Sequence, residues 1–211
     1  MSSDDIVHVI DDDEAVRESL EFLLRSAKVQ VRTYASAVAF LETCSGLKSG
    51  CIITDVRMPG IDGIELLRRL RQQDVQVPVI VVTGHGDVPL AVEAMKIGAA
   101  DFLEKPFDDD VLLASVRSAL SRHERVNQQD TERAAIQQRL AALSNRERQV
   151  LEGLISGYPN KTIAYDLGIS PRTVEIYRAN VMTKMEAKSL SELVRLALIA
   201  GVSGESASNR K

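Results

Sequence analysis

Carboxylate, hydroxyl and ammonium groups follow the ends of four short apolar runs in the first half of the chain. These groups are Asp11, Asp12, Asp13, Asp55, Thr83 and Lys105. Clustered carboxylates repel one another unless a cation lies among them, and their oxygen atoms suit Mg²⁺. An Asp beside Mg²⁺ can attack a phosphoryl group, while the cation and a Lys neutralise the transferred charge. If the chain folds so that these run ends meet, the set predicts phosphoryl chemistry.

The elements that would bring these groups together alternate regularly. Five apolar runs are predicted strands: Ile6–Ile10, Val29–Tyr34, Cys51–Thr54, Val77–Val82 and Ala100–Leu103. Segments with helical spacing of apolar residues separate them, as at Val16, Leu20 and Leu24. This alternation predicts a doubly wound α/β domain with a five-stranded parallel sheet. Ligands of such folds bind outside the carboxyl ends of the strands, where the polar groups above would gather.

Each polar residue also has a simpler interpretation. The three N-terminal aspartates can cap the following helix, and Asp13 is expected to do so. Asp55, Thr83 and Lys105 can each be an ordinary loop or surface residue. Their joint position at predicted strand ends favours a site over coincidence.

Composition excludes several classes of protein. The chain has 211 residues, of which 45% are hydrophobic and 27% charged, which is typical of one or two globular domains. Its two cysteines, Cys44 and Cys51, are too few for a disulfide framework or a thiolate zinc site. No apolar stretch approaches the roughly 20 residues of a membrane span, and no signal peptide is visible, so we expect a cytoplasmic protein.

Charge is distributed unevenly along the chain. Residues 125–211 contain 13 Lys and Arg against 9 Asp and Glu, a formal charge of +4. Residues 1–124 contain 13 against 21, a formal charge of −8, which leaves −4 for the whole chain. An acidic half suited to a cation and a basic half suited to phosphates indicate two domains with different partners. Ordinary surface charge is the alternative.

These patterns divide the chain into four segments. We expect an α/β domain at 1–123, a connector at 124–142, a helical domain at 143–203 and a frayed tail at 204–211. The connector has no Gly or Pro, and its composition favours helix over a flexible link. The alternative is a flexible connector.

The helical domain contains signals of a helix-turn-helix. Ser144 and Glu147 form a capping-box pattern before the first helix. A short helix from about Asn160 is followed by a Gly168 turn and by a helix capped at Ser170. The second helix of such a motif enters the major groove of DNA, and an ordinary helical bundle is the alternative.

Candidate DNA contacts lie on and near this second helix. Residues facing bases or the adjacent backbone would be Arg172, Thr173, Glu175, Ile176, Ala179 and Asn180. Candidate phosphate contacts are Lys161, Arg178, Lys184 and Lys188. Phosphate contacts position a protein on DNA, whereas base contacts specify the sequence.

Residues 5–122 resemble a response-regulator receiver domain. The motifs are V-I-D-D-D at 9–13, I-T-D-V-R-M-P-G-I-D-G at 53–63, V-V-T-G-H-G at 81–86 and D-F-L-E-K-P-F at 101–107. The resemblance implies that Asp55 accepts phosphate from a histidine kinase. It implies that Asp11, Asp12, Asp55 and the backbone carbonyl of Arg57 hold Mg²⁺.

The same resemblance assigns the remaining pocket residues. It implies that Thr83 turns toward the phosphoryl group, that Phe102 changes rotamer with it, and that a cis bond before Pro106 aims Lys105 inward. Trans is nevertheless the default for an X–Pro bond. His85 is either a plain loop residue or one that influences attack by water.

Residues 141–203 resemble the LuxR-type helix-turn-helix domain. The motifs are L-S-N-R-E-R-Q-V-L at 143–151, N-K-T-I-A-Y-D-L-G-I-S at 160–170 and R-T-V-E-I-Y-R-A-N-V-M-T-K-M at 172–185. A receiver followed by this domain is the arrangement of the NarL/FixJ family of response regulators. The resemblance extends to its nitrogen-fixation members, which implies a FixL-like oxygen-sensing kinase, promoter DNA and RNA polymerase as partners.

The leading hypothesis is a transcription activator that dimerises when phosphorylated on Asp55, with no enzymatic activity beyond its own phosphotransfer and dephosphorylation. One alternative is a Mg²⁺-dependent phosphohydrolase that uses Asp11 and Asp13, although this leaves Asp55 and the basic half without a role. A second is a DNA-binding scaffold whose receiver only docks partners.

Overall fold

The apolar runs of the first half form parallel strands in the computed structural model, which describes residues 5–84 and 88–202. The strands are β1 (Ile6–Ile10), β2 (Gln30–Tyr34), β3 (Cys51–Asp55), β4 (Val79–Thr83) and β5 (Asp101–Glu104). They form one sheet in the order β2-β1-β3-β4-β5, and every neighbouring pair is parallel. The predicted five-stranded parallel sheet is therefore confirmed, with strand ends displaced by at most two residues.

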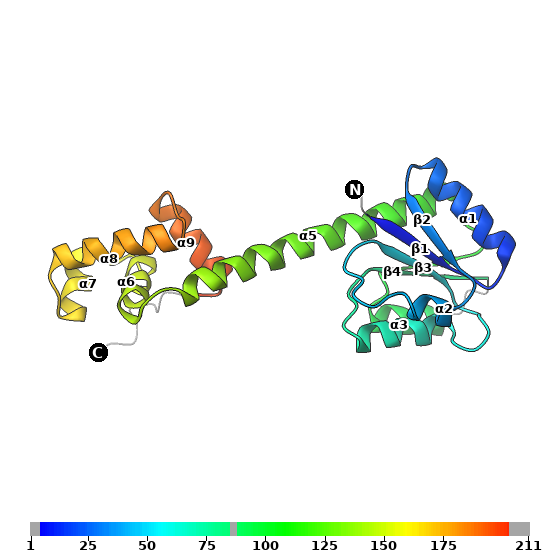
Figure 1. Cartoon of the computed structure of the whole chain (residues 1–211), viewed down its shortest axis with the longest axis horizontal. Helices are drawn as coiled ribbons and strands as arrows, with labels where there is room; N and C mark the ends of the chain where they lie inside the picture. The colour runs from blue at the N-terminus through cyan, green and yellow to red at the C-terminus, as the bar shows by residue number, and fades with distance from the viewer. Residues whose placement is uncertain (1–4, 85–87, 203–211) are drawn as a thin grey trace. The chain divides into compact units, whose positions relative to one another are not determined.

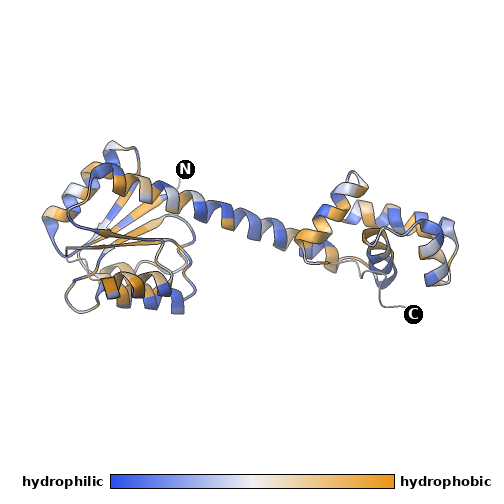
Figure 2. Ribbon diagram, turned by 180° about the vertical axis from the view of Figure 1, so that it is seen from behind, coloured by the Kyte–Doolittle hydropathy of each residue, from blue (hydrophilic) through white to orange (hydrophobic). Residues whose placement is uncertain are grey.

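Helices cover both faces of this sheet (Figure 1). They are α1 (Glu14–Ser26), α2 (Ala37–Leu41), α3 (Gly63–Gln72), α4 (Val88–Ile97) and the start of α5 (Asp109–Ala141). Along β4, Val79 and Val81 pack with α2, α3 and α4, whereas Ile80 and Val82 pack with α1 and α5. Because successive strand residues point to opposite faces, β4 must be apolar throughout to be buried on both sides. Figure 2 shows this apolar interior between hydrophilic outer helix faces.

Three residues with reactive side chains are part of this core. His8 is buried against the rings of Tyr34 and Phe40, and its Nδ1 lies 3.1 Å from the Tyr34 hydroxyl. Burial, with a smaller effect of Arg32, lowers the pKa of His8 to about 4, so its imidazole is neutral near pH 7. Cys44 and Cys51 are free, buried thiols, and burial raises the pKa of Cys51 to about 12. Burial accounts for all three as packing residues.

The chain forms two compact units, divided between Val126 and Asn127. The second unit contains α6 (Asn145–Ile155), α7 (Asn160–Leu167), α8 (Pro171–Lys184) and α9 (Leu190–Ile199). The predictions for His85 and for the tail at 204–211 fall outside the described residues. Within the described ranges, every helix is too short or too polar to cross a bilayer.

The connector expected at 124–142 differs from the observed structure at its C-terminal end. Residues 124–141 are helical and belong to the 33-residue α5. Ile136 and Leu140 are buried in the core of the second unit with Leu143, Val150 and Leu151. A domain that began at residue 143 would lack Ile136 and Leu140, which belong to its core. The second compact unit accordingly begins at Asn127.

We predict that Ile136→Ala destabilises the second unit by about 2 to 4 kcal/mol, because it leaves a cavity in a site that is 1% exposed. Hydrogen exchange of the core amides of the second unit in the full chain measures this loss. Val126→Ala, at a side chain that is 48% exposed, is the control and should change exchange little. Equal effects of the two substitutions would show that this part of α5 is only a connector.

Candidate functional site

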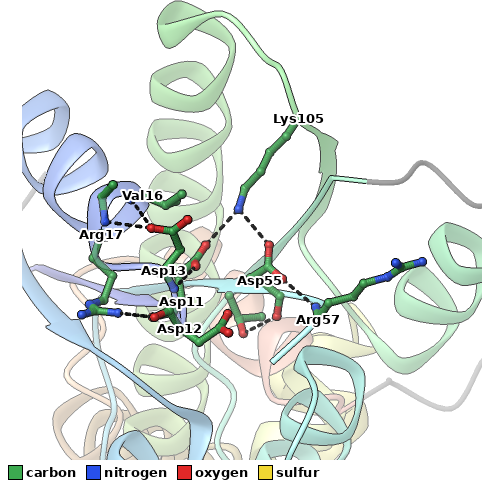
Figure 3. A network of polar contacts seen from close by, with 10 residues as sticks. Asp11, Asp12, Asp13, Val16, Arg17, Asp55, Arg57 and Lys105 are labelled. Carbon is green, nitrogen blue, oxygen red and sulfur yellow. Dashed lines mark hydrogen bonds and ion pairs between the residues drawn. The ribbon is translucent and has the colours of Figure 1, made fainter. Parts of the chain in front are cut away.

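Three strand ends place two carboxylates and one ammonium in contact (Figure 3). The Lys105 Nζ donates to Asp11 Oδ2 at 2.9 Å and to Asp55 Oδ1 at 2.8 Å. Asp11 follows β1, Asp55 ends β3 and Lys105 follows β5. Residues separated by up to 94 positions in the sequence thus form one ion-paired cluster at the carboxyl edge of the sheet, where the sequence predicts a site.

Asp11 is held at both of its oxygen atoms. The side chain is buried, and its Oδ1 accepts a hydrogen bond of 2.9 Å from the backbone N–H of Asp13. The carboxylate of Asp13 accepts from the N–H groups of Ala15 and Val16 and so caps α1, as predicted. The phosphohydrolase hypothesis needs Asp13 as a proton donor, but helix capping already occupies this side chain.

The backbone of Arg57 and of Gly63 lies close to Asp55. Asp55 is 9% exposed, and its Oδ2 accepts a hydrogen bond of 2.6 Å from the N–H of Arg57. A Cβ atom on Gly63 would lie 2.2 Å from the carbonyl oxygen of Asp55. Only glycine allows α3 to begin this close to the end of β3, which explains the glycine of the I-D-G sequence.

The electrostatics of the cluster favour the charged form of Lys105. Partial burial by itself lowers the pKa of Lys105, but its hydrogen bonds and charge interactions with Asp55 and Asp11 outweigh burial. The pKa of Lys105 is therefore raised above its ordinary value. The ammonium is a permanent cation between two buried carboxylates near neutral pH.

The other predicted pocket residues lie at neighbouring strand positions. Thr83 is buried at the end of β4, where its carbonyl accepts a hydrogen bond of 2.7 Å from the N–H of Lys105. The Lys105–Pro106 peptide bond is cis, as the receiver resemblance implies. Phe102 is partly buried in β5 and packs against the core shared by α3 and α4. Thr83 thus ends the strand next to the one that ends at Asp55, and Phe102 lies on the strand that leads into Lys105.

The predicted metal ligands are only partly assembled. Asp12 is exposed, and the Lys105 ammonium lies between Asp11 and Asp55. Across residues 5–84 and 88–202, no three acidic, histidine or cysteine side chains converge as a metal-binding group. The donor chemistry nevertheless fits Mg²⁺, which takes few protein oxygen ligands and retains several waters.

One residue of this network was not identified from the sequence. The Nη1 of Arg17, on α1, donates to the backbone carbonyls of Asp11 at 2.8 Å and Asp12 at 3.0 Å (Figure 3). In the sequence Arg17 is indistinguishable from other surface arginines of an amphipathic helix. Only its position above the loop that follows β1 reveals these contacts.

The second unit presents most of the predicted DNA-contacting residues at its surface. Ser170 caps α8, Pro171 occupies its first turn, and Gly168 is in the left-handed conformation that ends α7. The predicted contacts exposed on the first three turns of α8 are Arg172, Glu175, Ile176, Ala179 and Asn180. Lys161 and Lys188 are exposed, Arg178 is partly buried, and the Thr173 hydroxyl lies 2.8 Å from that of Ser170.

Lys184, one of the predicted phosphate contacts, makes an ion pair within the second unit. Its Nζ donates to Glu147 Oε2 at 2.7 Å and to the carbonyl of Ala142 at 3.2 Å. Glu147 is 4% exposed and also accepts from the N–H of Ser144 in the predicted capping box. The Lys184 hydrogen bond, followed by the Ser144 backbone hydrogen bond, lowers the pKa of Glu147 to about 2. Lys184 therefore fastens the end of α8 to the start of α6.

Comparison with known protein families agrees with this division of the chain. Residues 7–117 match the response regulator receiver domain, and residues 141–197 match the luxR family of bacterial regulatory proteins. The transcriptional regulatory protein FixJ of Azorhizobium caulinodans is 64% identical over 93% of this chain and 93% of its own length. FixJ of Rhizobium meliloti is 52% identical over 94% of this chain and 98% of its own.

Solved structures are similar over nearly the whole chain. The response regulator StyR aligns with a TM-score of 0.82 and 41% identity, covering 92% of this chain and 98% of its own. Full-length FixJ from B. japonicum aligns with a TM-score of 0.61 and 57% identity, covering 95% and 98%. Both alignments cover more than nine-tenths of this chain and so include its sheet domain and its helical domain.

We predict that Glu147→Gln destabilises the second unit by about 1 to 2 kcal/mol at pH 7, because Gln can still cap α6 but cannot pair with the Lys184 charge. The folded pKa of about 2 lies below the ordinary 4.5, so the carboxylate stabilises the fold above pH 4.5 and loses this effect as the pH falls toward 2. Hydrogen exchange should therefore show a difference from wild type that shrinks with acidification. Glu152→Gln, at an exposed residue of the same helix, is the control. A difference independent of pH would contradict the ion pair.

Proposed function

The chain belongs to the two-component response regulators that join a receiver to a LuxR-type DNA-binding domain, as FixJ does, and we propose that phosphoryl transfer to Asp55 switches its binding to DNA. The observation that carries this proposal is the pairing of Lys105 with both Asp55 and Asp11. This pairing supports the proposal because it puts the Asp55 carboxylate beside a fixed cation at the carboxyl edge of the sheet.

The proposed donor is a phosphorylated histidine of a sensor kinase. A carboxylate oxygen of Asp55 attacks phosphorus, the P–N bond breaks, and its electron pair returns to the imidazole. The product is an acyl phosphate, which carries more negative charge than the carboxylate it replaces. Lys105 and the N–H of Arg57, which contact Asp55 before transfer, are positioned to stabilise that charge.

Asp11, Asp12, Asp55 and the backbone carbonyl of Arg57 would hold Mg²⁺ at this edge. When bound, the cation supplies charge neutralisation for the transferring phosphoryl oxygens. The charge balance of the site supports this proposal. The buried carboxylates of Asp11 and Asp55 share the single ammonium of Lys105, so a further cation would neutralise the remaining negative charge. Asp12, which is exposed at the rim, remains available to a hydrated cation.

We propose that phosphorylation of Asp55 changes the packing of the surface formed by α4 and β5. Thr83 would move toward the phosphoryl oxygens, and the partly buried Phe102 on the next strand would change rotamer with it. A local change of charge can bias a surface with two packing arrangements. Phe102 packs against the same core as Ala94 of α4, so a change of the Phe102 rotamer can alter the packing of α4.

The surface of α4 is suited to a second copy of the chain. Val88, Val92 and Met95 are 73%, 46% and 50% exposed. Ala91, Val92, Met95 and Lys96 line a shallow depression. Pairing of two phosphorylated receivers over these apolar side chains would bring together two DNA-binding domains, which strengthens operator binding through effective concentration.

The DNA-binding step uses α8 as the recognition helix. Its exposed Arg172, Glu175, Ile176, Ala179 and Asn180 would face the major groove beside Thr173. Lys161, Arg178 and Lys188 would contact phosphates. A dimer would read two half-sites about one helical turn apart.

Similarity to the FixJ regulators supports a proposal for the physiological partners. We propose a FixL-like histidine kinase as phosphodonor, RNA polymerase as the partner at the promoter, and nitrogen-fixation genes as targets, because regulators named FixJ are 52% to 64% identical to this chain. These roles place the protein in the cytoplasm.

We expect wild-type protein to accept up to one phosphoryl group per chain from an acyl phosphate with Mg²⁺, and Asp55→Asn to accept none. Wild type treated with beryllofluoride should sediment as a dimer and bind operator DNA more tightly, whereas Asp55→Asn should not respond. Asp74→Asn, at an exposed carboxylate of the same unit, is the control. Unchanged sedimentation and affinity with the mimic would refute the switch, and steady turnover of a phosphoester would favour the phosphohydrolase.

Salt dependence distinguishes the two lysines of the helical unit. Lys161→Met should lower the slope of log affinity against log salt by about 0.9, the loss of one phosphate contact. Lys184→Met should leave this slope unchanged, because the Lys184 ammonium is paired with Glu147. Operator binding is measured below the unfolding temperature of each variant. An equal decrease in both slopes would mean that Lys184 also contacts phosphate.

A further inference from the structure

We infer that Arg17 is a positioning residue of the phosphoacceptor pocket, which sets the orientation of the Asp11 carboxylate and thereby the affinity of the site for Mg²⁺. The inference rests on the proposed function, since it concerns the same cation site. The guanidinium of Arg17 donates to backbone carbonyls, and Asp11 and Lys105 lie between it and Asp55 in the hydrogen-bonded series.

Arg17 binds two successive backbone carbonyl groups. Both carbonyls that follow β1, those of Asp11 and Asp12, accept from the single Nη1 of Arg17. A hydrogen bond from a guanidinium is charge-assisted and stronger than one between neutral groups. Arg17 itself is one turn into α1, and its backbone N–H bonds to the carbonyl of Asp13. The helix thus holds the loop that precedes it through a side chain.

A planar peptide transmits this contact to the carboxylate. The Asp12 carbonyl and the Asp13 N–H belong to one peptide group, and in a trans peptide they point in opposite directions. Arg17 binds the carbonyl side, while the N–H side donates to Asp11 Oδ1 at 2.9 Å. Hydrogen bonds in series polarise one another, so the cation strengthens the donation to Asp11 as well as fixing its direction.

The chain of contacts continues to the acceptor. Asp11 Oδ2 accepts from Lys105, and Lys105 also donates to Asp55 Oδ1. Arg17, the Asp12–Asp13 peptide, Asp11, Lys105 and Asp55 therefore form one connected series of hydrogen bonds (Figure 3). Groups that orient the ligands of a metal site affect its affinity by about 10- to 100-fold in other proteins.

The sign of the effect separates positioning from simple charge. Removing a cation near an acidic site strengthens Mg²⁺ binding if Arg17 acts only through its charge. Loss of the oriented Asp11 carboxylate weakens binding instead. Arg25, on the same helix, pairs with Glu21 and is the matched control for loss of one positive charge.

The test compares Arg17→Met, Arg17→Lys and Arg25→Met with wild type in the full chain. Titration with magnesium chloride by calorimetry should show about tenfold weaker binding for Arg17→Met and near wild-type binding for Arg25→Met. Arg17→Lys keeps the charge but lacks the guanidinium geometry, so partial recovery is expected. Equal or tighter Mg²⁺ binding by Arg17→Met overturns the inference.

The amide resonance of Asp13 provides a readout that needs no metal. Without Mg²⁺, Arg17→Met should shift the Asp13 N–H resonance upfield, since its hydrogen bond to Asp11 weakens, whereas Arg25→Met should not. An unchanged resonance refutes the inference. Absence of Mg²⁺ binding by wild type would contradict the cation site of the proposed function, and the Asp13 resonance would still decide the role of Arg17.

Discussion

Two buried carboxylates at the carboxyl edge of the sheet impose the main electrostatic constraint on this protein. Asp11 is 3% and Asp55 9% exposed, and burying negative charge at such sites costs free energy unless a cation pairs with it. Lys105 meets this requirement with hydrogen bonds of 2.9 and 2.8 Å. Because the three residues come from different strand ends, the order β2-β1-β3-β4-β5 is what makes the cluster possible.

Neighbouring residues position the two carboxylates through short-range contacts. Asp13 caps α1 and directs its N–H to Asp11, Gly63 lets α3 begin against the backbone of Asp55, and Arg17 holds the loop after β1. A phosphoryl group on Asp55 would add negative charge to this hydrogen-bonded network. Rearrangement of the network in response is the physical basis of the proposed relay to the surface of α4 and β5.

The helical unit also contains a buried carboxylate that is paired with a lysine. Its buried carboxylate, Glu147, is paired with Lys184 and capped by Ser144, but these contacts join α6 to α8 and involve no strand edge. This ion pair, between a buried Glu147 and a partly exposed Lys184, links the end of α8 to the start of α6. The exposed face of α8 can then carry base-contacting residues without contributing to the stability of the core.

The amino-acid sequence by itself determined the elements and their chemistry. Apolar runs, helix caps at Asp13, Ser144 and Ser170, and the polar residues at strand ends were sufficient to predict the α/β fold, the helix-turn-helix and the meeting of Asp55 and Lys105 at one sheet edge, because each depends on local spacing or on strand order. Long-range contacts decided the rest. Lys184 pairs with Glu147, Arg17 binds the carbonyls of the loop after β1, and Ile136 completes the core of the second unit. A charged or apolar side chain has the same local signal whether it faces solvent or a distant segment, and only the folded arrangement distinguishes the two.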